Sequence, residues 1–400
     1  MEYRISKKLR DMKPSAIREI FKSLTDPAII PFAAGNPNEE SFPAKEMGKI
    51  AAEIFESSAA KALQYGITEG YPPLREALAD RLERKFGIDK SKNTLIVVSG
   101  GQQGIELACK ALCDPGDKVL CEDPTFIGAL NAFRSNGAIP VGVEMDEEGI
   151  IPEALEKACD ENPDARLLYL IPTFQNPGGT TMSRDRRVKA YEIAKKHGII
   201  ILEDNPYGEL RFSGENIPTI KSMDTEGIVI YCGSLSKVLS SGMRIGFVSG
   251  PAEIIQKMVV AKQVEDVHTN QFFQMVCAGF INEYSLDEHI ERIRALYRRK
   301  CKIMMDALEQ YMPGYVSFTR PDGGLFVWLT LPEGTDLSLF VKKALERKVA
   351  VVPGTAFTPV EGAPSRSFRI TYATPTDTQI VEGVKILAEV AEELAPGAVK

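Results

Sequence analysis

Short runs of apolar residues, many of them β-branched, recur along the middle of the chain. Each run is followed by helix-like or turn-rich sequence, and its apolar residues are continuous rather than alternating with polar ones. Continuous runs are typical of strands buried on both faces, as in a mostly parallel sheet covered by helices. The pattern predicts an α/β fold with a mostly parallel, seven-stranded sheet, whose strands lie within residues 94–100, 118–123, 139–145, 167–172, 199–204, 228–234 and 244–250.

The pattern changes after Leu286. A long charged segment with helical spacing runs from there to a stop at Pro313 and Gly314. Beyond this stop, apolar runs and amphipathic helical segments indicate a smaller α+β domain. We therefore expect an N-terminal helix and arm that packs with the small domain, then a large domain, then the small C-terminal domain, in residues 1–40, 41–290 and 291–400.

Composition and charge exclude several classes of protein. The 400 residues are 44% hydrophobic and 26% charged, as in globular proteins. The net charge of -7 comes without a basic block, so we expect no nucleic-acid partner. The N-terminus lacks the apolar core of a signal peptide, and no stretch has the length of a membrane helix. Seven scattered cysteines without a C-x-x-C pair indicate reduced thiols in a cytoplasmic protein and no metal site.

The most informative segment contains Lys237, at the end of a predicted strand. Ser234 and Ser236 precede this lysine, and Arg244 follows it in a glycine-containing turn. A lysine in a pocket can lose its proton and condense with an aldehyde, while two hydroxyls and an arginine suit a phosphate dianion. A turn with a solvated lysine is the alternative interpretation of the same residues.

Asp204 and Tyr207 stand at the carboxyl end of the preceding strand, which is where open α/β sheets bind their ligands. A carboxylate at this edge can keep a pyridine nitrogen protonated and so make the ring an electron sink. Asp204 could instead cap a helix. The aspartate, the tyrosine and the later lysine together favour the ligand-binding interpretation.

Three further turns carry candidate binding residues. Gly100, Gly101 and Gln102 join a strand to a helix, where backbone N–H groups and the helix N-terminus favour a phosphate. Phe126 follows the next strand and could stack on a cofactor ring, and Asn176 could donate to a ring oxygen. A tight turn, a core position and simple turn chemistry, respectively, would explain the same residues.

Taken together and in order, these segments resemble the class I and II aminotransferases of fold type I, and most closely their 2-aminoadipate and kynurenine aminotransferase subgroup. The resemblance covers nearly the whole chain. Its motifs are AAGNP at Ala33, LQYG at Leu63, SGGQQ at Ser99, PTF at Pro124, NPGG at Asn176, EDNPYGEL at Glu203, SLSKVLSSGMRIG at Ser234 and SFRITYA at Ser367.

The resemblance implies that the cofactor is pyridoxal 5′-phosphate and that Lys237 holds it as a Schiff base. Asp204 would then pair with the pyridine nitrogen, and Tyr207 and Asn176 would contact the ring oxygen. The residues expected to hold the phosphate or stack on the ring are Gly100, Gly101, Gln102, Ser234, Ser236, Arg244 and Phe126.

The resemblance also implies how substrate and a second subunit contribute. Arg369 would receive the α-carboxylate of the substrate, with Asn176 and Gly35 completing the grip. Tyr65 would reach the phosphate in the neighbouring subunit, which implies a homodimer. Arg18, in an N-terminal segment that looks like the mobile helix of the subgroup, would meet a distal carboxylate of the substrate; a solvated helix face is its alternative role.

These residues predict an aminotransferase that moves the amino group of an L-amino acid to a 2-oxo acid, most plausibly 2-oxoglutarate, in a ping-pong mechanism. Glutamate, 2-aminoadipate, kynurenine, aromatic and branched-chain amino acids all remain open as donors. A lyase, a decarboxylase or a cyclising synthase of the same fold would use the same cofactor site.

Two other readings of the sequence stay open. A regulator with an aminotransferase-like domain is disfavoured because the resemblance begins within the first few dozen residues, where such proteins carry a DNA-binding segment. A nicotinamide-dependent Rossmann enzyme could use Glu122 and Asp123 at a strand end. The chain lacks the glycine fingerprint of such enzymes, and that reading leaves Lys237 and Asp204 unexplained.

Overall fold

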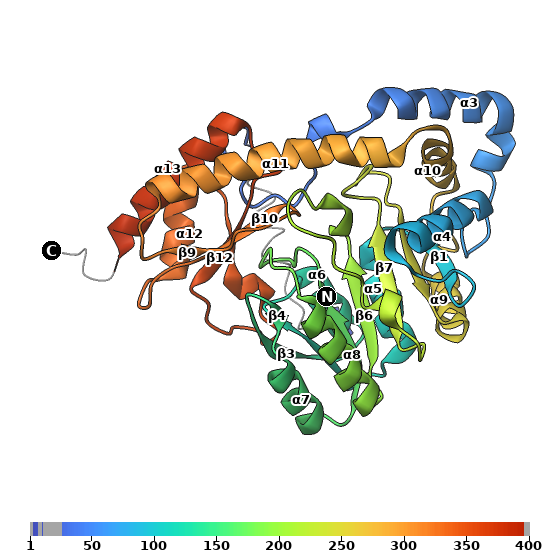
Figure 1. Cartoon of the computed structure of the whole chain (residues 1–400), viewed down its shortest axis with the longest axis horizontal. Coiled ribbons are helices and arrows are strands. Elements are labelled where there is room, and N and C mark those ends of the chain that lie inside the picture. The colour runs from blue at the N-terminus through green and yellow to red at the C-terminus, as the bar shows by residue number, and fades with distance from the viewer. Residues whose placement is uncertain (1–2, 7–9, 11–25, 396–400) are drawn as a thin grey trace.

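The computed structural model describes residues 3–6, 10 and 26–395. The helix expected at residues 15–24, and Arg18 with it, lie outside the described residues. Two sheets organise the described part of the chain: an eight-stranded sheet in the order β1-β8-β7-β6-β5-β2-β3-β4 and a four-stranded sheet in the order β11-β12-β10-β9. Figure 1 shows them as neighbouring layers, each with helices packed around it.

The large sheet contains every strand that the apolar runs predict. Strands β2, β3, β5, β6 and β7 pair in parallel, whereas β8 runs antiparallel to both β7 and β1. The eighth strand, β4, has only two residues and pairs with the end of β3, so no apolar run marks it. The bounds are β1 Thr94–Val98, β2 Lys118–Asp123, β3 Ile139–Asp146, β4 Gly149–Ile150, β5 Ala165–Leu170, β6 Ile200–Asn205, β7 Val229–Ser234 and β8 Gly246–Gly250.

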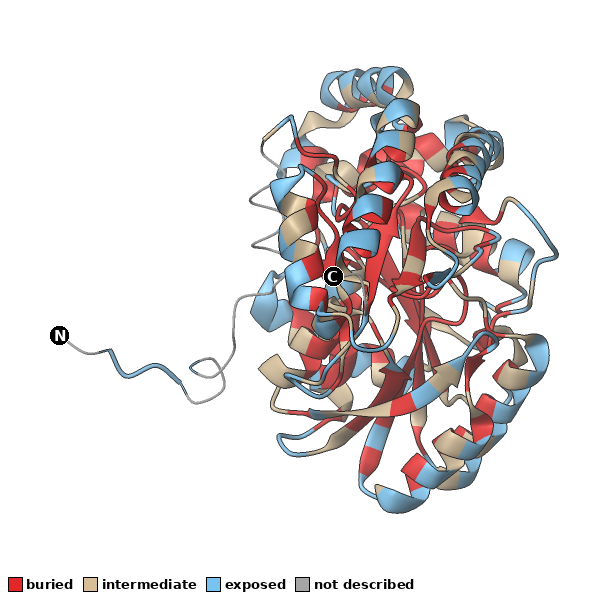
Figure 2. Cartoon of the chain, turned by 90° about the vertical axis from the view of Figure 1, so that its left-hand side faces the viewer, coloured by how far each residue is buried: buried red, intermediate tan, exposed pale blue. Residues whose placement is uncertain are grey.

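Helices cover both faces of this sheet, which explains why its strands read as continuous apolar runs. In β6, Leu202 packs on the face covered by α5, α6 and α9, and its neighbour Ile201 packs on the face covered by α7 and α8. Figure 2 shows buried residues through the sheet and exposed ones on the outer helix faces. The helices are α3 Ala44–Leu63, α4 Pro72–Phe86, α5 Gly101–Leu112, α6 Ile127–Ser135, α7 Pro152–Glu161, α8 Arg184–His197, α9 Ala252–Glu265 and α10 Gln271–Glu283.

The long helix α11, Leu286–Tyr311, runs along the top of the view in Figure 1, from near α10 beside the large sheet to α13 beside the smaller one. Arg294 and Arg298 donate to the carbonyl oxygens of Glu209 and Phe212, beside the large sheet, at 2.7 and 2.9 Å. On the other side α11 packs against α13. Helix α11 continues through residue 290 without a break. The domain boundary expected at residue 290 stays a prediction.

The smaller sheet follows α11 and matches the α+β pattern expected for this part of the chain. Its strands are antiparallel, and β9 has only two residues, so the sequence pattern does not reveal it. The elements are β9 Ser317–Phe318, β10 Phe326–Thr330, α12 Leu337–Glu346, β11 Val352–Pro353, β12 Ser367–Thr371 and α13 Asp377–Leu394. None of the helices among the described residues has the length and apolarity needed to span a membrane.

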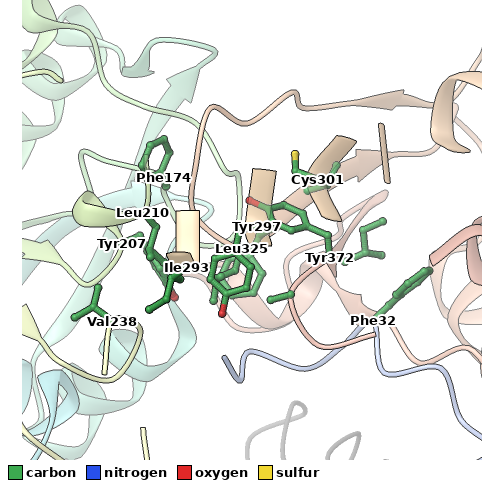
Figure 3. Packing of buried hydrophobic residues seen from close by; sticks show 14 of the residues in the cluster. Phe32, Phe174, Tyr207, Leu210, Val238, Ile293, Tyr297, Cys301, Leu325 and Tyr372 are labelled. Carbon is green, nitrogen blue, oxygen red and sulfur yellow. The ribbon is translucent and has the colours of Figure 1, made fainter. Parts of the chain in front are cut away.

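The segment before α3 joins the smaller sheet. Ile30 forms a parallel bridge with Val349, and the backbone N–H of Thr371 donates to the carbonyl of Phe32 at 2.9 Å. These contacts bring residues 33–35 beside β12. Figure 3 shows part of the shared core, in which Phe32 and Tyr372 lie on one side and Tyr207 on the other.

Candidate active site

A cavity of about 440 Å³ opens at the carboxyl ends of β5, β6 and β7, and the smaller sheet closes its far wall. This is the edge at which open α/β sheets bind ligands. The sequence-predicted residues that line the cavity are Gly35, Gly101, Gln102, Phe126, Asn176, Asp204, Tyr207, Ser234, Ser236, Lys237, Arg244 and Arg369.

Lys237 stands in the turn after β7, with its amine inside the protein. Nζ donates a hydrogen bond of 2.7 Å to the carbonyl oxygen of Gly35. Burial, together with the positive charges of Arg369 and Arg244, lowers the pKa of Lys237 to about 8. About a tenth of the amine is then neutral at pH 7, far more than for a solvated lysine, and the neutral form is the one that attacks a carbonyl carbon.

Asp204 stands near the end of β6 and is buried. The hydroxyl of Tyr169, on the neighbouring strand β5, donates to its carboxylate at 2.7 Å. Burial raises the pKa of Asp204 to about 7, against the lowering effect of the Tyr169 hydrogen bond. No cation among the described residues contributes to that shift. The carboxylate is thus suited to a ligand that brings its own positive charge.

The beginning of α5 and the turn around Arg244 form a set of donors. Gly101 starts the helix, and Gly100, with φ of 87°, occupies the capping position without a side chain to satisfy the first N–H groups. Arg244 packs so closely on Gly100 that a Cβ there would lie 2.3 Å from its Nη2. Ser234 and Ser236 line the same part of the cavity. Helix N–H groups, hydroxyls and a guanidinium together suit a phosphate.

Arg369 projects from β12 into the opposite side of the cavity. Its guanidinium donates to Oδ1 of Asn176 at 2.7 Å and to the carbonyl of Ala33 at 3.1 Å, and it lies 4.1 Å from the centre of the Phe326 ring. Its Nε is buried and has no partner among the described residues. Burial lowers the pKa of Arg369 to about 10, which still leaves it charged. A buried cation without an anionic partner is suited to a carboxylate ligand.

Tyr207 and Phe126 complete the cavity between these groups. Tyr207 is buried, which raises the pKa of its hydroxyl, and its ring meets Phe326 edge to face with centroids 5.7 Å apart. Phe126 occupies the capping position of α6. The cavity therefore combines an aromatic wall with a nucleophilic amine, a buried carboxyl group and two anion sites.

Comparisons with known proteins agree with this arrangement. The profile of the family described as aminotransferase class I and II matches residues 27–387. The chain belongs to this family. It is 41% identical to aromatic-amino-acid aminotransferase 1 of Thermococcus litoralis over 97% of this aminotransferase and 94% of the relative.

Two solved structures show the same fold. Kynurenine aminotransferase of Pyrococcus horikoshii, in complex with PMP, is 40% identical with a TM-score of 0.94, and 97% of each chain is covered. The α-aminoadipate aminotransferase LysN of Thermus thermophilus, complexed with N-(5′-phosphopyridoxyl)-L-leucine, is 37% identical with a TM-score of 0.90, covering 98% of this aminotransferase and 97% of LysN.

Aminotransferases of this family use pyridoxal 5′-phosphate, and the residues present fit this group. The uncapped start of α5 and Arg244 offer donors to its phosphate. Asp204, which has no cationic partner in the described part of the chain, offers a partner to its pyridine nitrogen. Lys237 offers a buried amine to its aldehyde. The unpartnered Nε of Arg369 remains for the substrate.

Two predicted residues that the structure describes, Gly100 and Tyr65, do not line the cavity of this chain. Gly100 precedes Gly101, which does line it, and the Arg244 guanidinium occupies the space that a side chain at Gly100 would fill. Tyr65 is 80% exposed and touches only the edge of the His268 ring among aromatic neighbours, with centroids 5.7 Å apart. Glu122, the residue that a nicotinamide enzyme would need for its ligand, is buried and accepts a hydrogen bond from the backbone of Ile171 at 3.0 Å. The Glu122 carboxylate is therefore bonded inside the protein and is not available to a nicotinamide ligand.

Sequence reasoning missed several residues of this aminotransferase site. Tyr169 supports Asp204 from the next strand, Phe326 lies under Arg369, and the Ala33 carbonyl fixes the guanidinium. The only local signal for Tyr169 was a polar hydroxyl inside an apolar run. Asn36, Pro206 and Ser241 also line the cavity and lie within the quoted motifs, although no role was assigned to them, and Ile105 and Ile171 line it from outside the motifs.

Proposed function

We propose that this aminotransferase transfers the amino group of an aromatic L-amino acid to 2-oxoglutarate by ping-pong kinetics, with Lys237 as the residue that bonds to the cofactor. One observation carries the site assignment: the amine of Lys237, the carboxyl group of Asp204 and the guanidinium of Arg369 all line one cavity. The aromatic donor is supported by apolar lining from Phe126, Ile171 and Phe326, and by the similarity to an aromatic-amino-acid aminotransferase.

When bound, pyridoxal phosphate supplies an aldehyde that condenses with amines and a ring that withdraws electrons from the substrate Cα. Lys237 would hold the cofactor through Nζ, and when free the same neutral Nζ would move the proton of the substrate Cα. Asp204 would keep the pyridine nitrogen protonated, because a carboxylate buried at this depth gains most from a cationic partner.

The other residues bind and orient. Arg369 and Asn176 hold the substrate carboxylate, which fixes the Cα near Lys237. Tyr207 and Asn176 would contact the ring oxygen, and Phe126 would stack on the ring. Gly101, Gln102, Ser234, Ser236 and Arg244 would hold the phosphate, the charge of which would anchor the cofactor while Lys237 is free.

We propose that the functional unit is a homodimer in the cytoplasm. Tyr65 is a large side chain with 80% of its surface exposed, outside the cavity of its own chain, as a residue that serves a neighbouring subunit would be. The seven cysteines are buried and free, which suits a reducing compartment. Arg18 would widen the donor range to substrates with a distal carboxylate.

A donor panel tests this proposal. Purified enzyme with pyridoxal phosphate is incubated with single L-amino acids and 2-oxoglutarate, and both the new 2-oxo acid and glutamate are quantified. The proposal expects equal amounts of the two products, with phenylalanine, tyrosine and kynurenine at the top of the ranking.

Two outcomes would contradict it at different levels. Release of ammonia or carbon dioxide without glutamate would assign a lyase or a decarboxylase to the same site. Fast transfer from 2-aminoadipate alone would contradict the aromatic donor while leaving the transfer reaction in place, and Arg18→Ala should then abolish that activity.

A further inference from the structure

An ion pair between a buried lysine and a partly exposed aspartate lies behind the turn that precedes α5. Lys262, in the last turn of α9, has no exposed side-chain surface, and its Nζ lies 2.7 and 2.8 Å from the two carboxylate oxygens of Asp266. Burial by itself raises the pKa of Asp266, but hydrogen bonds from Lys262, Gln103 and Ser99 outweigh it and bring the pKa below its ordinary value. The carboxylate is therefore ionised at neutral pH.

The pair is linked to the turn through two side chains. Oδ2 of Asp266 accepts hydrogen bonds from Oγ of Ser99 at 2.8 Å and from Nε2 of Gln103 at 2.9 Å. Oε1 of Gln103 accepts from Nζ of Lys262 at 2.8 Å and from the backbone N–H of Ser99 at 2.7 Å. Ser99 is thus held by its N–H and by its hydroxyl.

Ser99 is the residue from which the phosphate turn departs. Gly100 follows it with φ of 87° and no capping side chain, and Gly101 begins α5. The carbonyl of Ser99 also accepts a hydrogen bond from Nη2 of Arg244 at 3.3 Å. A displacement of Ser99 would therefore move the first helix N–H groups and Arg244 together.

We propose that the Lys262–Asp266 ion pair, acting through Gln103 and Ser99, positions the turn of residues 99–101 for the cofactor phosphate and so sets how long the cofactor stays bound. None of these four side chains lines the cavity, so they are positioning residues and not contacts. The inference rests on the proposed function, because it takes the start of α5 as the phosphate site. Loss of the Lys262 amine would remove the donor that Gln103 and Asp266 share, so both side chains would lose a hydrogen bond that fixes them.

The chain offers a control for the loss of a buried lysine. Lys221 pairs with Asp224 at an Nζ to Oδ2 distance of 2.9 Å, with side-chain exposures of 3% and 1%. Neither residue lines the cavity. Lys221→Met and Lys262→Met should both lower the free energy of unfolding, but Lys221→Met should leave the phosphate turn in its place.

The experiment measures cofactor release from holoenzyme. Wild type, Lys262→Met, Ser99→Ala and Lys221→Met, each purified with cofactor, are diluted into buffer that contains inorganic phosphate as competitor, and the loss of the cofactor absorption band is followed. Lys262→Met should release the cofactor about tenfold faster than wild type, the change expected when a hydrogen bond to a charged group is lost. Ser99→Ala, at a partly exposed position, should release it severalfold faster, and Lys221→Met at the wild-type rate.

A second readout is the ³¹P NMR signal of the bound cofactor, which should shift or broaden in Lys262→Met and Ser99→Ala but not in Lys221→Met. Equal release rates and equal ³¹P signals in Lys262→Met and Lys221→Met would overturn the inference. If Lys262→Met does not fold, wild-type release and an unchanged ³¹P signal in Ser99→Ala would overturn it.

Cofactor release from Arg244→Gln distinguishes a failure of the positioning role from a failure of the proposed phosphate site. If release from Arg244→Gln is also unchanged, the phosphate site itself is misplaced. If Arg244→Gln releases the cofactor quickly while the Lys262 and Ser99 variants do not, the phosphate site stands and only the positioning role is wrong.

Discussion

Burial destabilises the charged form of Asp204 when no ligand is bound, and the same burial favours the binding of a cationic ligand. Its pKa of about 7 lies well above the ordinary value of 3.8 because burial penalises the charged form. A cationic ring nitrogen at this position would remove the penalty. The same residue therefore links cofactor binding to pH.

This link gives a prediction for protein freed of cofactor. Native Asp204 binds its proton more tightly than unfolded Asp204 does, so its contribution to stability is full below about pH 4 and declines as the pH rises toward 7. Asp204→Asn has no such proton. In chemical denaturation, the variant should gain on wild type by at most ~1.4 kcal/mol per pH unit in that window. If the stability difference between Asp204→Asn and wild type does not change with pH, Asp204 is not a buried carboxyl group without a cationic partner.

Arg369 leads to a prediction on substrate binding. Arg369→Lys removes the planar fork that reaches both Asn176 and Ala33, and a lysine cannot bind a carboxylate in the same two-point manner. We expect kcat/KM to fall about 10- to 100-fold, as for the loss of one charged hydrogen bond, while the cofactor band stays. Arg347→Lys, a surface change beside Glu389 and Glu393, is the control and should leave the kinetics unchanged.

At this scale the sequence could predict residues that stand in compact motifs. Lys237, Asp204 and Arg369 each follow or lie within an apolar run, and the structure places all three around the cavity. It could not predict Tyr169 or Phe326, because their contacts come from strand pairing and from the packing of two sheets, which no local pattern records.

Among the elements, the start of α5 depends most on backbone conformation. Gly100 has φ of 87° and lies against the guanidinium of Arg244, so it has both a conformational and a steric need for glycine. Gly116, with φ of 103°, has the conformational need alone, since nothing lies within 4 Å of its missing Cβ.

Substituting the two glycines in turn distinguishes the effect of backbone strain on stability from the effect of Gly100 on the phosphate site. Gly100→Ala and Gly116→Ala should each lower the free energy of unfolding by about 1–3 kcal/mol through backbone strain, measured by denaturation, and the loss should be larger in Gly100→Ala because its Cβ also meets Arg244. Only Gly100→Ala should also displace Arg244 and speed cofactor release. Equal release rates in the two variants would show that Arg244 does not need the space that Gly100 leaves.

Apolar runs predicted the elements of the large sheet well because both faces of its strands are buried. The runs failed for β4 and β9, which have two residues each and are set by their partners β3 and β10. The antiparallel direction of β8 could not be read from its residues either, since a buried strand looks alike in both directions.

For the whole molecule, the site depends on contacts between distant parts of the chain. Arg369 donates to the carbonyl of Ala33 across 336 positions, and Lys237 donates to that of Gly35 across 202. The residues around Lys237 indicated it directly, whereas Ala33, Gly35 and Arg369 were indicated only through the resemblance to a family. Their meeting point follows from how the N-terminal segment joins β12, which is a property of the fold.

The proposed dimer makes a prediction about Tyr65. If its hydroxyl serves the neighbouring subunit, Tyr65→Phe should speed cofactor release severalfold with little change in thermal stability, because the side chain is 80% exposed in its own chain. Sedimentation should show a dimer for both proteins. A monomeric wild type with full activity would contradict this assignment.

The most direct test of the central claim concerns Lys237. Purified wild type with pyridoxal phosphate should show the visible absorption band of a covalently bound cofactor, and reduction with borohydride should fix the cofactor to the peptide that contains Lys237. Lys237→Ala should lack this band and lose transamination by several orders of magnitude. A colourless wild type, or a cofactor fixed to another lysine, would contradict the account.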